Sequence, residues 1–147
     1  MIDKKDIIIL KELKKDGRLS AQDISKATKI PVTTIFNRIR RMEKTGVIKG
    51  YTVILDEGKT GRNVAAYVSM TVDYNLLKRK GMTQQELAAK LRQYEFVDEV
   101  DMITGTSDIV VKIRTTDISQ LNEFVTKYMR NMEGVERTQT SVILESF

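Results

Sequence analysis

The chain has 147 residues, of which 41% are hydrophobic and 31% are charged, a composition typical of a folded globular protein with one medium domain or two small ones. The absence of Cys and His excludes disulfides, thiolate nucleophiles, imidazole bases and the usual zinc ligand sets, so we expect no enzymatic activity and no cofactor. No apolar run approaches the roughly 20 residues that span a bilayer, and no secretory cleavage site follows the N-terminus, so we expect a cytoplasmic protein.

The net charge of +5 is unevenly distributed along the chain. Residues 1–62 hold 15 Lys and Arg against 8 Asp and Glu, a net charge of +7, whereas the remainder has a net charge of −2. A solvated basic surface and a polyanion-binding surface are both compatible with this asymmetry.

The first predicted helix begins at Asp3 and ends before Gly17. Ile7, Leu10 and Leu13 are spaced to lie on one of its faces, and a glycine is a common residue just after a helix end.

Two further short helices are predicted before residue 47. Ser20 and Asp23 form a capping-box pattern at the start of a helix that runs to about Thr28. Pro31 suits the start of the next helix, because its fixed φ and missing N–H are tolerated there, and Gly46 ends that helix.

The third predicted helix has two chemically different faces. Ile35, Ile39 and Met42 lie on one stripe and are expected to pack. The opposite face carries Thr33, Asn37, Arg40, Arg41 and Lys44. Two short helices joined by a tight turn, the second of them basic, indicate a helix-turn-helix.

Residues 47–62 are expected to connect two domains. Val47–Leu55 is rich in β-branched residues and predicts a linker strand, and the charged, glycine-containing segment Asp56–Arg62 follows as a hinge. The expected domains are therefore residues 1–50, a helix-turn-helix unit with a possible wing, and residues 63–147, with residues 51–62 as linker strand and hinge.

Residues 63–147 alternate between strand and helix patterns. The predicted strands and helices, in chain order, are Val64–Val72, Thr83–Tyr94, Val97–Thr104, Ile109–Thr115, Ile118–Met132 and Val135–Leu144. The order βαββαβ predicts an α+β, ferredoxin-like antiparallel sheet with two helices on one face. Asp73–Met82 is expected to be a solvated loop, although its Lys78-Arg79-Lys80 run could also be a basic contact.

One face of this sheet would remain uncovered by helices. Val64, Ala66, Val68 and Met70 are predicted to lie on it, which would favour a partner sheet. The alternative is a face polar enough to stay solvated.

Three stretches resemble the Lrp/AsnC, or feast/famine, family of transcription regulators over nearly the whole chain. They are Ile24–Tyr51 with its Arg38–Ile48 run, Thr104-Gly105-Thr106-Ser107-Asp108, and Gly134–Thr140. The resemblance implies a DNA-binding, nucleoid-associated homodimer that assembles further into tetramers or octamers, with a ferredoxin-like domain that in many members senses amino acids. Pro31, where relatives commonly have Ser or Thr, and the long Asp73–Met82 connection depart from the family pattern.

The third helix supplies most of the candidate DNA contacts. Side chains near the N-terminal half of a recognition helix point into the major groove, and arginines can bind guanine or phosphate. The candidates are Val32, Thr33, Thr34, Asn37, Arg40, Arg41, Lys44, Ser20 and Lys49. Arg38 lies nearer the packed edge, where an internal salt bridge is an equal alternative. A dimer would require a pseudo-palindromic operator.

The Gly105–Asp108 loop is the candidate effector site. Its backbone amides suit a carboxylate, and Asp108 suits an ammonium group. The candidates are Gly105, Thr106, Ser107, Asp108, Thr138 and Thr140. The alternative is an ordinary turn in which Asp108 binds a neighbouring amide.

Two other functions compete with a sequence-specific regulator: an architectural DNA-binding protein and an enzyme that uses the ferredoxin-like half. The enzyme is disfavoured because no pair of Asp, Glu, Lys or Ser residues falls into a recognisable catalytic arrangement. An architectural protein that wraps DNA without an effector would show weak discrimination between sequences. RNA binding by the sheet is disfavoured because the strands lack paired aromatics for base stacking.

Overall fold

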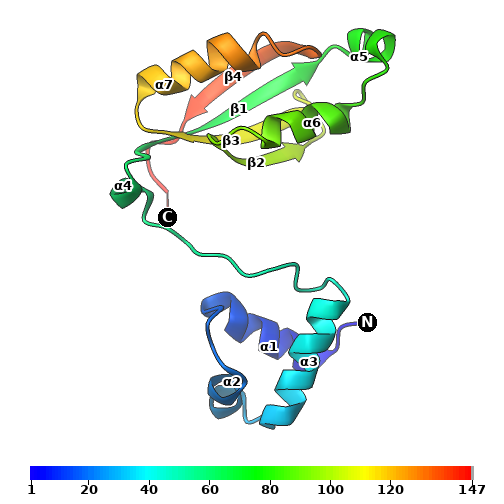
Figure 1. The fold of residues 1–147 in the computed structure, drawn as a ribbon, viewed down its shortest axis with the longest axis vertical. Helices are drawn as coiled ribbons and strands as arrows, with labels where there is room; N and C mark the ends of the chain where they lie inside the picture. The colour runs from blue at the N-terminus through cyan, green and yellow to red at the C-terminus, as the bar shows by residue number, and fades with distance from the viewer. Residues whose placement is uncertain (147) are drawn as a thin grey trace. The chain divides into compact units, whose positions relative to one another are not determined.

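The computed structural model describes residues 1–146 and divides into two compact units, Met1–Ile54 and Leu55–Phe147 (Figure 1). Within the described residues, no helix has both the length and the apolar character needed to cross a membrane.

The N-terminal unit consists of the three predicted helices, α1 (Lys4–Lys15), α2 (Ala21–Thr28) and α3 (Val32–Lys44). The predicted Ser20 cap of α2 is present, and the Asp3 side chain, directly before α1, accepts hydrogen bonds from the amides of its first turn. α3 starts after Pro31 without a side-chain cap, because proline has no hydroxyl to accept from the first amides of the helix. Gly46 follows its end with φ +72°.

The core of this unit is a small aliphatic cluster of Ile9, Ile24, Ile30, Ile35 and Met42, with Ile39 partly buried against it. The predicted inward stripe of α3 is therefore confirmed. For α1 the predicted face was wrong at one position, because Ile7 is 60% exposed whereas Ile9 is fully buried. The inward face of α1 is rotated so that it also includes Asp6, a buried carboxylate that apolar periodicity cannot anticipate.

The turn between α2 and α3 contains the single non-glycine residue with positive φ among the described residues, Lys29 at +60°. Its amide donates to the carbonyl of Ser25 at 2.8 Å, and the Ser25 hydroxyl donates to the carbonyl of Ile30 at 2.6 Å. These bonds hold the backbone that orients α3 relative to α2.

The predicted linker strand Val47–Leu55 is absent: these residues form a turn and irregular chain. A strand requires a neighbour for its backbone N–H and C=O groups, and no segment among residues 1–146 pairs with it. The side chain of Ile54 is accordingly almost wholly exposed.

The C-terminal unit contains the predicted βαββαβ order with two added helices. Its elements are α4 (Glu57–Thr60), β1 (Val64–Val72), α5 (Tyr74–Lys80), α6 (Gln84–Arg92), β2 (Val97–Met102), β3 (Ile109–Thr115), α7 (Ile118–Glu123), the π-helical η1 (Phe124–Met129) and β4 (Val135–Val142). The sheet is antiparallel with strand order β2-β3-β1-β4. Helices α6 and α7 lie on one of its faces (Figure 1).

The predicted inward and outward faces of β1 were reversed. Ala66, Val68 and Met70 are buried in the core beneath the helices, and Val64 packs against the same cluster. Period-two alternation separates two sets of residues but does not say which set faces the core. The open face instead presents the half-exposed Tyr67, whose ring lies under the Lys112 ammonium at 5.9 Å.

The segment expected as a loop, Asp73–Met82, forms the two-turn helix α5. Asp73 caps it through the amide of Leu76 at 2.8 Å. Leu77 enters the core, which apolar spacing over so short a segment did not indicate. Lys78 and Arg79 are exposed, and Lys80 pairs with Glu133 at 3.0 Å.

The helix predicted at Ile118–Met132 changes from α-helical to π-helical at Phe124. The wider turn buries Met129 and leaves Tyr128 half exposed. Tyr128 still contacts an aromatic cluster, with ring centroids 6.1 Å from Tyr94 and 5.9 Å from Phe124.

Replacing Gly134 with Ala is expected to destabilise the C-terminal unit by about 1–3 kcal/mol, because a Cβ there would overlap the Leu77 side chain and would strain a backbone at φ +94°. Gly105→Ala is the control: its φ is +120° but no atom lies within 4 Å of the added Cβ. Urea unfolding of both full-length variants measures the difference. Equal losses would mean that Leu77 moves aside without cost.

Candidate functional site

The outward face of α3 presents most of the predicted DNA contacts together. Thr33, Asn37, Arg40 and Lys44 are exposed, and Val32 is 40% exposed at the first turn. Thr34 is only partly accessible. These side chains are free of the core because Ile35 and Met42 fix the opposite face of the same helix. The face combines hydroxyl, amide and guanidinium donors, as base and phosphate recognition requires.

Two predicted contacts lie outside α3. The Ser20 hydroxyl accepts from the Asp23 amide at 3.2 Å and donates to the Asp23 carboxylate, so its first role is to cap α2. Lys49 is exposed beyond the end of α3.

An ion-pair cluster joins α3 to α1. Nη1 of Arg38 lies 2.6 Å from Oδ2 of Asp3 and 2.9 Å from Oδ1 of Asp6, and Arg41 pairs with the second oxygen of Asp6. Asp6 is fully buried and also accepts from the Asp3 amide at 3.0 Å. Each oxygen of the buried carboxylate therefore has a cationic partner, which is the condition for burying a charge at acceptable cost.

The cluster shifts the pKa values of both carboxyl groups downward. The hydrogen bond from Arg38 is the main cause that lowers the pKa of Asp3 from 3.8 to about 2. Burial of Asp6 opposes its ionisation, but the Asp3 amide, Arg38 and Arg41 together outweigh burial and lower its pKa.

The cluster also decides how the arginines of α3 are used. Arg38 takes the internal salt bridge that was one of its two predicted roles. Arg41, predicted as a DNA contact, has one guanidinium nitrogen committed to Asp6, although its side chain is about half exposed. The sequence analysis did not identify Asp6. The available signal was its spacing, because Asp6 lies four residues before Leu10 and seven before Leu13, on the face predicted to pack.

Phe36 is a second residue that the sequence did not single out. Its ring is 52% exposed on the outward face of α3, and the guanidinium of Arg40 lies 5.3 Å from the ring centroid. Phe36 lies four residues from both Val32 and Arg40, so the three form one row on the helix surface.

The effector loop is built as a turn tied to its surroundings. Gly105 has φ +120°, which only glycine adopts readily. The Asp108 carboxylate accepts from the Val72 amide and from the Tyr74 hydroxyl, both at 2.9 Å. The Asp108 carbonyl accepts from Gln84 at 3.0 Å. These bonds match the turn alternative, and they occupy the carboxylate predicted to meet an ammonium group.

Part of the predicted effector set lies around one shallow hollow of about 250 Å³. Thr106, Ser107 and Thr138 line it, and so does Arg137, which the prediction did not include. Gly105 and Asp108 belong to the same loop but do not line the hollow, and Thr140 lies further along β4. The hollow is thus lined by hydroxyl groups and one arginine.

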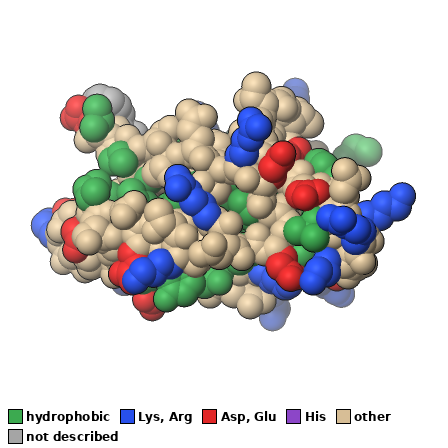
Figure 2. Space-filling view, turned by 90° about the horizontal axis from the view of Figure 1, so that it is seen from above, with side chains coloured by type: hydrophobic (Ala, Val, Ile, Leu, Met, Phe, Trp, Pro, Cys, Tyr) green, Lys and Arg blue, Asp and Glu red, His purple; other side chains and the backbone are tan. Residues whose placement is uncertain are grey.

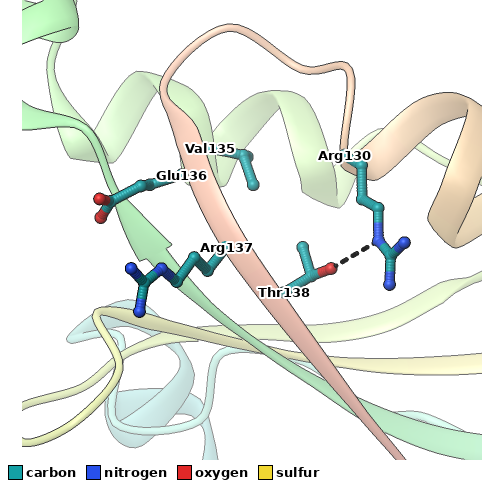
Figure 3. A pocket seen from close by; sticks show the side chains of 5 residues that line it. All are labelled: Arg130, Val135, Glu136, Arg137 and Thr138. Atoms are coloured by element: carbon teal, nitrogen blue, oxygen red, sulfur yellow. Dashed lines mark hydrogen bonds between the residues drawn. The ribbon is translucent and has the colours of Figure 1, made fainter.

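A neighbouring hollow of about 340 Å³ follows β4, with Arg130 and Arg137 on its border (Figure 3). Arg130 donates to the Thr138 hydroxyl at 3.1 Å, and the guanidinium of Arg137 points away from it. The two arginines therefore do not converge on one ligand position. Elsewhere, basic and acidic side chains are interspersed on the surface seen from above (Figure 2).

Comparisons with known proteins agree for both units. Residues 65–147 match the family model of the Lrp/AsnC ligand binding domain, and residues 2–49 match that of a winged helix-turn-helix DNA-binding domain. The HTH-type transcriptional regulator FL11 of Pyrococcus furiosus is 38% identical over 98% of this chain and 88% of its own length. FL11 of Pyrococcus horikoshii is 37% identical over 99% and 89%.

Solved structures share the fold over the full chain. B. subtilis LrpC has a TM-score of 0.83 at 25% identity, covering 100% of this chain and 97% of its own. The transcriptional regulator NMB0573 of Neisseria meningitidis, in complex with L-Met, has a TM-score of 0.87 at 23% identity, covering 99% and 91%.

Acidification is expected to destabilise the N-terminal unit as the pH falls from about 4 toward 2. Asp3 and Asp6 have lower pKa values in the folded chain, so their stabilisation is present above the unfolded value and is lost as the unfolded state takes up protons first. Urea unfolding followed through NMR amide signals of α1 and α3 measures this loss.

Asp6→Asn should flatten that pH dependence and lower stability at neutral pH. Lys15→Gln, which removes the exposed cation of a pair with Glu12 within α1, should leave both nearly unchanged. An unaltered pH slope in Asp6→Asn would refute the assigned role of Asp6.

Proposed function

The chain belongs to the Lrp/AsnC family of transcription regulators and carries its helix-turn-helix, and from this we propose that it binds a pseudo-palindromic operator as a homo-oligomer whose affinity for DNA changes with a free amino acid. Residues 1–50 would bind DNA, and residues 63–147 would hold the effector and the oligomer contacts.

The outward face of α3 carries the DNA-binding part of the proposal. Asn37 and Arg40 are exposed donors on a helix whose other face is fixed by a buried core, so their positions are determined before DNA arrives. Lys44 and Lys49 would neutralise phosphates at the far end of the same surface. Arg41 would add a phosphate contact only through the nitrogens that Asp6 leaves free.

The hollow between the Gly105–Asp108 loop and β4 supports the proposal of an effector with an anionic group. Arg137 can donate to a carboxylate while Thr106, Ser107 and Thr138 offer hydroxyls around it. A free amino acid carries such a carboxylate, and the matched family domain is a ligand binding domain. Since Asp108 is bonded to Val72 and Tyr74, the ammonium group of the effector would need another acceptor.

Oligomerisation follows from the type of DNA site proposed. One helix-turn-helix reads a single half-site, and a two-fold dimer reads two half-sites about 34–36 Å apart. The open sheet face presents Tyr67 with partly buried Ala65 and Val110, among charged neighbours. It is the proposed partner surface, and larger assemblies such as tetramers or octamers would extend it.

The DNA proposal is tested by selecting bound fragments from random and genomic DNA at about physiological salt. A single pseudo-palindromic motif is expected. Asn37→Ala should lower the affinity for DNA with this motif more than the affinity for random DNA. Recovery of fragments without sequence preference would replace this proposal with an architectural role. Light scattering of the free protein measures the oligomer.

The effector proposal is tested with a mixture of the common L-amino acids added to the operator-binding reaction. A shift in operator affinity is expected for the parent protein, and Arg137→Gln should require roughly tenfold more of the active amino acid for the same shift. Arg79→Gln, an exposed arginine of α5 outside the hollow, is the control. An equal response in both variants would rule out Arg137 as the carboxylate partner.

A further inference from the structure

Phe36 is an apolar side chain in a position that packing within its own unit does not explain. It is 52% exposed, and it is absent from the aliphatic cluster that holds α3 against α1 and α2. Exposing a large ring to water forgoes the stabilisation that burial would give. A single exposed apolar residue is common on protein surfaces, and the neighbours of Phe36 distinguish it from such residues.

Apart from Val32, one turn earlier on the same row, those neighbours are hydrogen-bond donors and cations. Asn37 and Arg40 are exposed beside Phe36 on the same helix, and Lys44 follows one turn later. Glu43, the one acidic residue of α3, accepts from the Tyr51 hydroxyl at 2.9 Å. An apolar patch within a basic rim complements an anionic polymer that also presents methyl groups, and DNA is such a polymer because thymine carries its 5-methyl group in the major groove.

The contact between Phe36 and Arg40 adds a geometric constraint. With the guanidinium 5.3 Å from the ring centroid, the arginine is drawn to one side of the ring. The row Val32–Phe36–Arg40 therefore presents two apolar side chains and then a cation along one line of the helix. Such a row can contact a base pair through its methyl group while the arginine reaches a neighbouring base or phosphate.

We propose that Phe36 determines sequence specificity by contacting the 5-methyl group of a thymine in each operator half-site. Val32 completes the apolar surface around that methyl group. The inference rests on the proposed DNA-binding function and adds to it the chemical group that is read.

The test replaces single thymines of the selected operator with deoxyuridine, which removes only the methyl group. Replacing one particular thymine in a half-site is expected to weaken the parent protein's affinity for the operator about three- to fivefold, which is the effect of one buried methyl group. Phe36→Ala should bind the thymine operator more weakly and should be insensitive to deoxyuridine at that position.

Two controls separate this role from general damage. Ile7→Ala removes a comparably exposed apolar side chain from α1 and should keep the parent deoxyuridine profile. Phe36→Leu keeps an apolar surface and should retain part of the methyl effect. Circular dichroism confirms that each variant is folded.

The outcomes distinguish the two proposals. If selection yields no motif, the sequence-specific function fails, and the methyl contact is then judged by comparing random DNA containing thymine with the same pool containing deoxyuridine. If the parent protein binds every deoxyuridine-substituted DNA as well as the thymine form, or if Phe36→Ala keeps the parent profile, the methyl contact is refuted.

Discussion

The position of α3 depends on a carboxylate that has no access to water. Asp6 is fully buried, and leaving its charge unpaired would cost roughly 3–5 kcal/mol, a large part of the stability of a small domain. Arg38 and Arg41 supply the neutralising charges from α3, so the helix that faces outward is held to α1 by its own cations. Five buried aliphatic residues and the partly buried apolar residues around them provide the rest of the packing. In so small a core, the ion pairs restrict rotation of α3 in a way that non-directional apolar contacts cannot.

This arrangement divides the arginines of one helix between two tasks. Arg38 and Arg41 face α1, whereas Arg40 lies on the outward side over Phe36. The basic charge of the N-terminal unit therefore overstates the charge available to a polyanion. A total charge read from the sequence measures attraction at a distance, while the number of close contacts depends on which cations already have partners.

Much of the fold could be predicted because local signals and tertiary packing agree. The caps at Asp3 and Ser20, the start at Pro31 and the strand Val64–Val72 all follow from short-range chemistry. The failures lie where the answer depends on distant partners. Residues far away in sequence decide which face of β1 is buried. They also decide that Leu77 of α5 packs into the core and that Asp6 of α1 faces inward. Within the candidate site, the exposed face of α3 was predictable from the sequence. The position of Arg137 beside the hollow and the hydrogen bond of Asp108 to Val72 depend on how the strands pair, which the sequence does not reveal.

The turn at Lys29 shows a different kind of balance. A left-handed backbone costs a lysine about 1–2 kcal/mol, but a glycine there would lose about 0.5–1 kcal/mol more conformational entropy on folding. The steric cost is about twice the entropic gain, so lysine remains less favourable than glycine here, and the bonds from Lys29 to Ser25 and from Ser25 to Ile30 keep the turn closed in spite of it. The tightest point of the helix-turn-helix therefore restricts residue type through its backbone, because a β-branched side chain would be strained further at the same positive φ.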